Sequence, residues 1–553
     1  MRKTKFKILL VFIVCHLLSP ILFSQEKLIK IVNKDSLTVQ LIERIDPNLK
    51  HQKHSKILEE ITVLKLKIEE TGYLNNTIEL IKRNDSLYSL NIQLNKKTDS
   101  IHLTLSKILT AQIKNSKETI TLPFEHLTNY IEKIKQELES NGQTFAKVYL
   151  TKLKLQDSKA NAFLKLTLEK PRLIDKVFFK DYPLFPTNFK KRFLKLNKKI
   201  TFSRKNIQSI SNKINTLNFV HQFKKPETLF TNDSTFLYLY LKKKRINQFD
   251  GLIGFRTNEN GKLIFNGHLD ISLKNNFNKG EEISLYWSNN GSDQQDLNLT
   301  IATPYIYNSI FSPELNLKIK KQDSTFITTQ LKTTVRTNIS DRTTLGVILN
   351  NETSKNSLIL KDPSIQKFSK SNYGLEFTYK KNASYSNFIT TQISLSALFG
   401  TKTSNNNKTQ QTNIHLFLER KLKIYSRSYL YFKNTTRFLK SQNMLFNELF
   451  QLGGATSIRG FNENSLFASS YNFSNIEYQF KTAQLSHLYL FSDLGLLENS
   501  VSNTKNSLTS FGLGYNYQTN KGLIDISYSL GKTDKTNFEL DKGLFHIKFV
   551  NIF

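Results

Sequence analysis

Residues 262–274, KLIFNGHLDISLK, decide the fold of the C-terminal part of this chain. One face of this stretch is apolar and consists of Leu263, Phe265, Leu269, Ile271 and Leu273. The opposite face is polar and consists of Lys262, Asn266, His268, Asp270 and Lys274. Successive side chains of an extended strand point to opposite sides. The stretch is therefore expected to form a β-strand that separates an apolar environment from an aqueous one.

The same alternation continues to the end of the chain. It recurs at 414–424 and at 524–530, and turn dipeptides such as Asn260-Gly261 and Asn290-Gly291 separate the strands. We count roughly 16 strands, and lengths of about 9–11 residues suit tilted strands that cross a bilayer. The pattern favours an all-β transmembrane barrel of antiparallel strands over residues 247–553. A soluble sandwich, whose strands also alternate, is the other interpretation.

The chain begins with the pattern of an export signal. Arg2, Lys3, Lys5 and Lys7 precede an apolar run at 8–23, and Ser24-Gln25 offers a cleavage site. Residues 1–24 are predicted to be a secretory signal peptide. The alternative is an N-terminal membrane anchor, for which the run is short.

Composition excludes several classes of function. Hydrophobic residues make up 39% of the chain, the net charge is +34, and Cys15 is the single cysteine. A helical membrane protein would be more apolar, and one cysteine supports neither a disulfide framework nor a Cys-based zinc site. The ten histidines show no metal-ligand spacing, and the sequence has no nucleophile elbow or phosphate-binding loop. We expect no catalytic residues, metal or cofactor, and hence no enzyme.

The N-terminal region contains a threefold repeat. Apolar positions at helical spacing lie at 57–68 and again at 127–138, and each set is followed by a glycine, Gly72 or Gly142. A third set lies at 207–217. Strand-like stretches surround each set, so the predicted unit is strand, helix, helix, strand, strand over about 70–76 residues. Leu and Ile also recur every seven residues over 80–108, which leaves a coiled coil as the alternative.

Three α+β modules are expected, at residues 25–98, 99–170 and 171–246. Their order and size resemble POTRA domains, the periplasmic modules of outer-membrane assembly proteins. The third module ends in a basic run that consists of Lys242, Lys243, Lys244 and Arg245. This run is either a solvated surface or a contact for anionic lipid head groups beneath the barrel. No nucleic-acid partner is expected, because an exported protein rarely meets nucleic acid.

A long connection between two barrel strands, residues 441–467, carries a specific motif. It reads QLGGATSIRGF over 451–461 and includes Gly453, Gly454, Arg459, Gly460 and Phe461. The motifs NIEY at 475–478 and FSDLG at 491–495 follow it in order. This ordered set resembles the BamA/TamA superfamily, also called bacterial surface antigens. Three modules and about 16 strands are most similar to the TamA branch.

The resemblance implies roles for individual residues of the loop. By this resemblance the loop is expected to enter the barrel, and Arg459 is expected to contact the acidic residues Glu477 and Asp493 on the following strands. Strand parity places both carboxylates on the inner face. A guanidinium can bridge two carboxylates in a fork that lysine cannot form. The contact either holds the loop in place or takes part in gating.

The C-terminal strand carries a second signal. Its apolar side consists of Phe545, Ile547, Phe549 and Phe553. This is similar to the signal that outer-membrane barrels present to their own insertase. In the family the last strand also pairs with the first, here near 251–257, to close the barrel. The first strand is short and contains Gly251 and Gly254, so this seam is expected to be weak and able to pair with a client strand.

These features predict an outer-membrane assembly or translocation factor with periplasmic N-terminal modules. It would insert or export client proteins through the seam. Its expected partners are outer-membrane lipids, unfolded outer-membrane or secreted polypeptides, and a periplasm-spanning protein. The alternative is a two-partner-type secretion transporter for one dedicated exoprotein. A passive porin would need neither the loop motif nor the modules.

Overall fold

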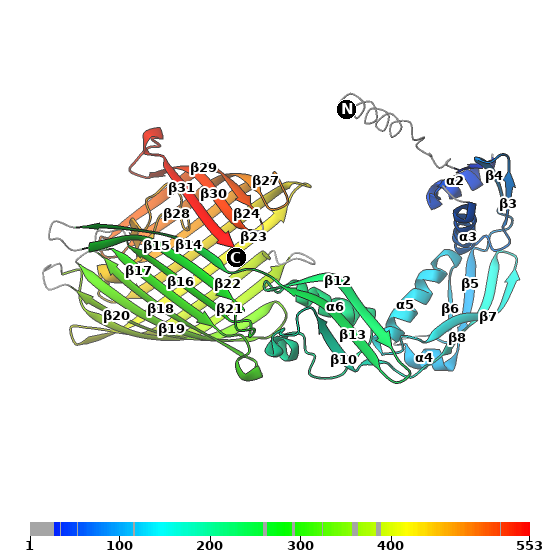
Figure 1. The fold of residues 1–553 in the computed structure, drawn as a ribbon, viewed down its shortest axis with the longest axis horizontal. Helices are drawn as coiled ribbons and strands as arrows, with labels where there is room; N and C mark the ends of the chain where they lie inside the picture. The colour runs from blue at the N-terminus through cyan, green and yellow to red at the C-terminus, as the bar shows by residue number, and fades with distance from the viewer. Residues whose placement is uncertain are drawn as a thin grey trace, which may run out of the picture. The chain divides into compact units, whose positions relative to one another are not determined.

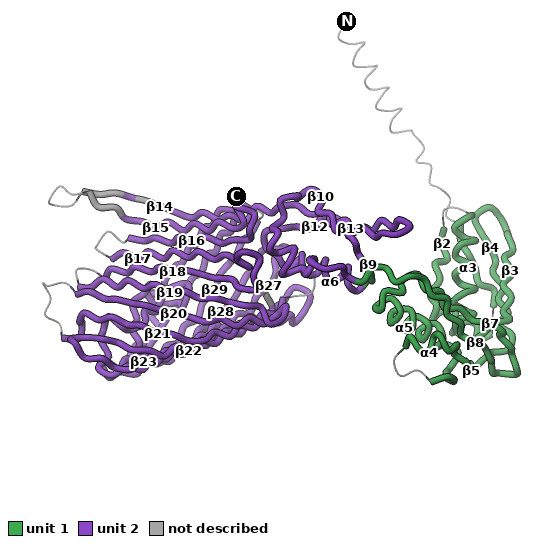
Figure 2. The backbone as a smooth tube through the Cα atoms, turned by 90° about the horizontal axis from the view of Figure 1, so that it is seen from below, with its two compact units in different colours: residues 1–173, 201–204 green, residues 174–200, 205–553 purple. Residues whose placement is uncertain are grey.

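The computed structural model describes residues 27–33, 35–51, 54–113, 117–257, 263–289, 294–322, 325–356, 363–382, 389–519 and 521–552. The predicted signal peptide and Phe553 lie outside these residues. The chain forms two compact units, residues 1–173 with 201–204 and residues 174–200 with 205–553 (Figure 2). None of the helices in the described ranges has the length and apolarity needed to span a membrane.

The first unit contains two modules of the same topology. The first module comprises β1 (Lys27–Ile31), α2 (Ser36–Ile45), β2 (Lys50–His51), α3 (His54–Glu70), β3 (Thr77–Lys82) and β4 (Leu87–Gln93). The second comprises β5 (Ser100–Leu105), α4 (Lys107–Gln112), β6 (Thr119–Pro123), η1 (Phe124–His126), α5 (Leu127–Ser140), β7 (Lys147–Gln156) and β8 (Lys159–Thr167). Their sheets have the orders β2-β1-β4-β3 and β6-β5-β8-β7. In each sheet the two central strands are parallel.

The repeat differs from its predicted form in one respect. A short strand, β2 or β6, lies between the two helices of each of these modules. Strands this short carry too little alternation to be found from sequence. The coiled-coil alternative over 80–108 is wrong, because Leu80, Leu87 and Ile101 of this repeat lie on the strands β3, β4 and β5.

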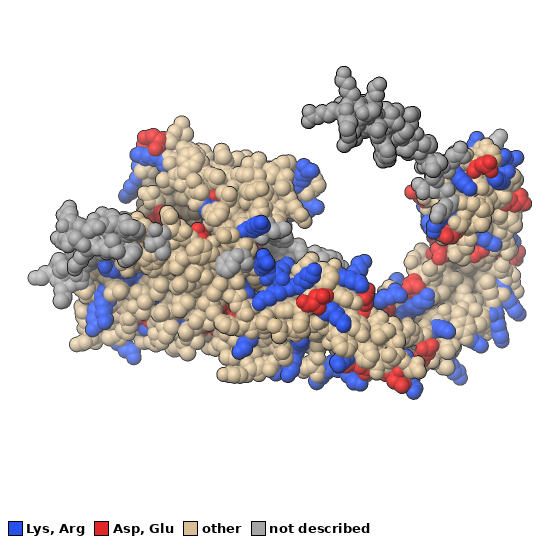
Figure 3. Space-filling model, viewed as in Figure 1, with Lys and Arg blue, Asp and Glu red and all other residues tan. Residues whose placement is uncertain are grey.

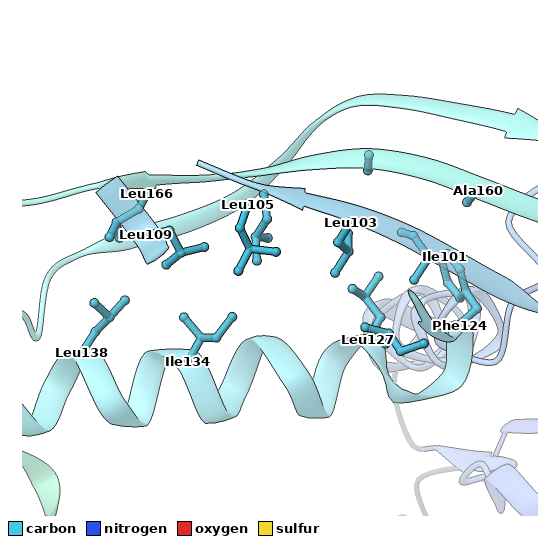
Figure 4. Close-up of a cluster of buried hydrophobic side chains, with 13 residues drawn as sticks. Ile101, Leu103, Leu105, Leu109, Phe124, Leu127, Ile134, Leu138, Ala160 and Leu166 are labelled. Atoms are coloured by element: carbon cyan, nitrogen blue, oxygen red, sulfur yellow. The ribbon is translucent and has the colours of Figure 1, made fainter. Parts of the chain in front are cut away.

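The long helix of each module packs its apolar face on the sheet. In the second module Leu127, Ile134 and Leu138 of α5 point towards a layer of apolar side chains that includes Leu103, Leu105 and Leu109 (Figure 4). This burial stabilises the helix because short isolated helices are marginal in water. After α3 the chain turns at Gly72, whose φ is +102°. A Cβ there would lie 2.4 Å from the Thr98 carbonyl oxygen, so only glycine fits.

The second unit contains most of the third module. Its elements are β10 (Lys176–Lys180), η2 (Phe189–Phe193), α6 (Arg204–Asn215), β12 (Val220–Phe230) and β13 (Thr235–Lys243), and the short strands β9 (Leu173–Ile174) and β11 (Ile200–Thr201) precede β10 and α6. The sheet order is β10-β13-β12, and β10 and β13 are again parallel.

The rest of the second unit is a closed barrel (Figure 1). In order its strands are β14 (Gln248–Thr257), β15 (Leu263–Lys274), β16 (Glu282–Asn289), β17 (Gln295–Ala302), β18 (Phe311–Gln322), β19 (Phe326–Asn338), β20 (Thr343–Asn356), β21 (Phe368–Asn382), β22 (Ile389–Ser404), β23 (Asn407–Lys423), β24 (Ser428–Ser441), β27 (Ser470–Lys481), β28 (His487–Asn499), β29 (Thr504–Gln518), β30 (Gly522–Thr533) and β31 (Leu544–Ile552). The short helices η3 (Ile306–Asn308) and η5 (Leu540–Lys542) lie in connections. The prediction of an antiparallel barrel of 16 strands is confirmed.

The barrel wall has an apolar outer face and a polar inner face. On β20 the outward side chains Leu345, Val347 and Leu349 are exposed, whereas Asn350 is buried on the inside. A cavity of about 660 Å³ inside the barrel is lined mostly by polar and charged residues, which come from the barrel strands and from the connection between β24 and β27. Exposed apolar side chains on so many strands would be a liability in water and are typical of a lipid-facing wall.

The third module packs against turns at one rim of the barrel. The ring of Phe189 lies against that of Tyr305, with the ring centroids 5.3 Å apart. The Asn188 amide donates hydrogen bonds to the carbonyl oxygens of Lys279 and Pro304, at 2.8 and 2.6 Å. These contacts place the module beside the turns that follow β15 and β17.

Candidate functional site

The loop between β24 and β27 folds into the barrel. It contains η4 (Phe446–Glu448), β25 (Phe450–Leu452) and β26 (Leu466–Ala468). β25 and β26 pair as an antiparallel stem, and residues 453–465 form its tip. Along the loop, Asn447 donates to the Ser354 hydroxyl of β20 at 2.8 Å, and Gln451 donates to Gln322 of β18 at 3.3 Å. These partners belong to the opposite wall of the barrel from β27 and β28, so the loop crosses the lumen.

Arg459 at the tip of the loop is clamped by two carboxylates. Its Nε and Nη2 donate to Oδ2 and Oδ1 of Asp493 on β28, at 2.9 and 2.6 Å. Its Nη1 donates to Oε1 of Glu477 on β27, at 2.7 Å. Its backbone N–H also donates to Asp493 Oδ2, at 3.0 Å. Arg459 is 7% exposed and Asp493 is fully buried, so the structure brings these three predicted residues together away from solvent.

The neighbours of Arg459 hold the tip in shape. The guanidinium carbon lies 3.6 Å from the ring centroid of Phe491, so the cation also stacks on an aromatic face. Gly460 has a φ of +81°, and a Cβ there would lie 2.7 Å from the backbone nitrogen of Gly531 on β30. The backbone of the tip therefore approaches the wall more closely than a side chain would allow.

The remaining motif residues close the tip upon itself. The Gly454 N–H donates to the carbonyl oxygen of Phe461 at 2.9 Å, and the Gly453 N–H donates to the Ser457 hydroxyl at 2.8 Å. Phe461 packs on a small core that includes Leu452 and Ile458. Gly453 and Gly454 both have positive φ, which permits these tight bends.

A second anchor, which was not predicted, fixes the start of the loop. Glu448 of η4 accepts from Lys402 Nζ of β22 at 2.8 Å and from Gln411 Nε2 of β23 at 2.9 Å. Lys370 Nζ of β21 lies 3.4 Å from the same carboxylate. Lys402 also donates to the carbonyl oxygens of Gln442 and Asn443, at 3.1 and 2.8 Å.

This second anchor is buried as deeply as the first. Glu448 is 5% exposed and Lys402 is 1% exposed. Breaking a buried ion pair by removing one partner costs about 3–5 kcal/mol, because it leaves an uncompensated charge. The loop therefore connects two parts of the barrel wall, one formed by β21, β22 and β23 and the other by β27 and β28. Release of Arg459 alone would leave the first residues of the loop in place.

The barrel closes through a weak contact between its first and last strands. Two residue pairs join β14 to β31 in the structure, Gln248 with Ile552 and Phe249 with Asn551. Ten pairs join β14 to β15 on its other side, and eight join β31 to β30. Figure 1 shows β14 and β31 meeting near the C-terminus and diverging towards their other ends. The pairing lies at the start of β14, before the predicted 251–257, so that prediction was misplaced by a few residues.

The other predicted site residues lie apart from the loop clamp. Phe545, Ile547 and Phe549 of β31 are exposed on the outer face of the barrel, and Phe553 lies beyond the described residues. Lys242, Lys243, Lys244 and Arg245 form the end of β13 and the link to β14. In the described part of the chain, no group of His, Cys, Asp or Glu side chains is arranged to hold a metal ion.

Comparison with known proteins identifies the barrel. The model of the Omp85 superfamily domain matches residues 275–549. No curated protein matches the sequence. CdiB from Escherichia coli has a similar solved structure, with 12% identity and a TM-score of 0.51 over 94% of this chain and 100% of that chain.

Two further solved structures are similar at lower scores. CdiB from Acinetobacter baumannii has 14% identity and a TM-score of 0.49, and the match covers 81% of this chain and 89% of the CdiB chain. BamA from Haemophilus ducreyi lacking POTRA domains 1–3 has 14% identity and a TM-score of 0.48, and the match covers 81% of this chain and 97% of the BamA chain. Likeness at such identities concerns the fold. None of these matches singles out the TamA branch, which stays a prediction.

Proposed function

Since this chain belongs to the Omp85 superfamily, the group that the loop and strand motifs predicted, we propose that it assists the insertion or export of client proteins through the seam between β14 and β31. The Omp85 barrel implies an outer-membrane location. We place the N-terminal modules in the periplasm, where they would receive client polypeptides, and we assign no chemical step to the protein.

The weak seam is the observation that carries this proposal. Beyond its two pairs with β31, the backbone of β14 pairs only with β15 among the described strands. An exposed strand edge presents free N–H and C=O groups, to which an extended segment of another chain can add. Opening costs little because few hydrogen bonds are lost, each of which contributes about 0.5–1.5 kcal/mol net.

The clamped loop favours the seam over the lumen as the route. Passage of a polypeptide through the lumen would have to displace a loop held by two buried charge clusters, one at Glu448 and one at Arg459. The seam needs no such displacement. A client strand could pair with β14 while the loop keeps the remainder of the wall in shape.

The second candidate is a two-partner-type transporter for one exoprotein. The similarity to CdiB from Escherichia coli over nearly the whole chain favours it at the level of fold. Both functions could use the same seam, and they differ in the number of clients. A periplasm-spanning partner protein belongs to the first function and a dedicated exoprotein to the second.

Depletion of the protein followed by proteomics of the outer membrane tests the proposal. Loss of many barrel proteins is expected for a general assembly factor, and loss of a single surface or secreted protein would support the transporter. An unchanged outer-membrane proteome, with altered permeability to small solutes only, would refute both and leave a passive pore.

A further inference from the structure

A basic cleft lies at the joint between the third module and the barrel. Its volume is about 570 Å³. The cationic side chains that line it are Lys243, Lys244, Arg245 and Lys274. Figure 3 shows Lys and Arg side chains gathered on the face where β12 and β13 approach the barrel. The sequence supplies three of the four cations as consecutive residues at the end of β13 and in the link to β14, and the fold adds Lys274 from the end of β15.

Two hydrogen bonds hold the chain segment that lines this cleft. The Lys244 N–H donates to the carbonyl oxygen of Phe219 at 3.0 Å. The Asn247 side-chain oxygen accepts from the Lys274 N–H at 3.0 Å. The link between β13 and β14 is therefore held at both ends, beside the end of β15.

The positive charge of the cleft is poorly compensated. Lys274 pairs with Glu282 at 2.9 Å, and Lys243 reaches the side-chain oxygen of Asn278 at 3.4 Å. Among the described residues, no carboxylate forms an ion pair with Lys243, Lys244 or Arg245. Partial burial lowers the pKa of Lys244 below its ordinary value. Cations gathered in one partly enclosed site favour a bound anion, which would relieve their mutual repulsion.

The cleft lies where the barrel wall begins. β14 starts at Gln248, directly after the link, and β15 ends at Lys274. Phe249 and Phe277, which are close in sequence to Gln248 and Lys274, are exposed. Aromatic side chains typically mark the interface between the hydrocarbon and the aqueous phase on a barrel. At this rim the anions of a bilayer are the phosphates of its head groups.

We propose that this cleft binds the phosphate-bearing head group of an anionic phospholipid, at the foot of the seam. Lys243, Lys244 and Arg245 supply the charge, and Asn247 and Asn276 supply polar contacts at the same opening. The bound lipid would join the third module to the start of β14. This proposal concerns lipid binding alone and does not depend on which clients the protein handles.

Lipid retention by the full-length protein tests this site. The protein would be reconstituted with phosphatidylcholine and a small fraction of phosphatidylglycerol, extracted in detergent, and examined by native mass spectrometry for bound phosphatidylglycerol. The test variant is Lys243→Gln/Lys244→Gln/Arg245→Gln. The control is Lys191→Gln/Lys198→Gln/Lys205→Gln, which removes the same charge from exposed positions of the same module.

Each lysine or arginine near a lipid surface contributes about a fivefold gain in affinity, so the test variant should bind phosphatidylglycerol roughly a hundredfold more weakly. The parent and the control should retain it. A heat-dependent shift on a gel would show that all three barrels are folded. Equal retention by the test variant and the control would overturn the proposal, and so would displacement of the lipid by millimolar inorganic phosphate, which would identify a site for the free ion.

Discussion

Replacing Arg459 by alanine should release the tip of the loop and leave the barrel folded. The change removes three side-chain hydrogen bonds to two carboxylates. Asp493 would remain fully buried without a cation. We estimate a cost of about 3–5 kcal/mol to the docked tip, which corresponds to a rise in its released population of roughly a hundredfold to a few thousandfold. The anchor at Glu448 should retain the first part of the loop.

Cysteine labelling measures this release directly. The single native cysteine, Cys15, lies in the predicted signal peptide, so an introduced Ile458→Cys would be the only thiol of the mature chain. Ile458 is 1% exposed, and its replacement should react slowly with a maleimide in the parent. In the Arg459→Ala background the reaction should accelerate at least a hundredfold, because labelling follows the open population when opening is fast.

Arg459→Lys is the matched variant for this experiment. It keeps the charge and loses the planar fork, so the labelling rate should fall between those of the parent and the alanine variant. Client insertion in reconstituted vesicles should be highest for the parent, lower for Arg459→Lys and lowest for Arg459→Ala. Unchanged labelling of Ile458→Cys in Arg459→Ala would refute the claim that the guanidinium holds the tip.

Two further predictions concern the second anchor and the last strand. Glu448→Gln should leave Lys402 buried without a counter-ion, at a cost of about 3 kcal/mol or more, and should increase the uptake of a large antibiotic by cells. Glu448→Gln/Lys402→Met should recover part of this lost stability. Equal antibiotic uptake by cells with the parent and with the single variant would contradict a role for this anchor. Phe545→Ser/Phe549→Ser should lower the amount of folded barrel in the outer membrane, measured by its heat-dependent gel shift, because it removes two outward-facing aromatic side chains. Leu540→Ser, at an exposed position outside the strands, is the control and should assemble normally.

The barrel could be predicted from sequence because its signal is local. Alternation along one strand, as in residues 262–274, already defines an apolar and a polar face. The same parity assigns Glu477 and Asp493 to the inner face, since Tyr478 and Leu490 fall on the outer one. The order of helices and strands within the N-terminal modules could also be predicted, because helical spacing and a helix-ending glycine such as Gly72 are features of residues close together in sequence.

Contacts between residues far apart in the chain could not be predicted from the sequence. Glu448 and Lys402 are 46 positions apart, and no spacing rule links a lysine on one strand with a glutamate in a loop. The register of β31 on β14 depends on barrel closure, so the seam was placed a few residues from its observed position. The basic cleft likewise needed the fold, because Lys274 joins the run at 243–245 only when β15 ends beside the link.

Restraint of the seam tests the proposed mechanism most directly. Phe249→Cys/Asn551→Cys introduces thiols at directly paired positions of β14 and β31, where a disulfide can form. Ser527→Cys/His546→Cys places the same bond between β30 and β31, which are already fully paired, and serves as the control. In reconstituted vesicles we expect oxidation to stop client insertion by the seam variant, reduction to restore it, and the control to stay active throughout. Full activity of the oxidised seam variant would contradict the account.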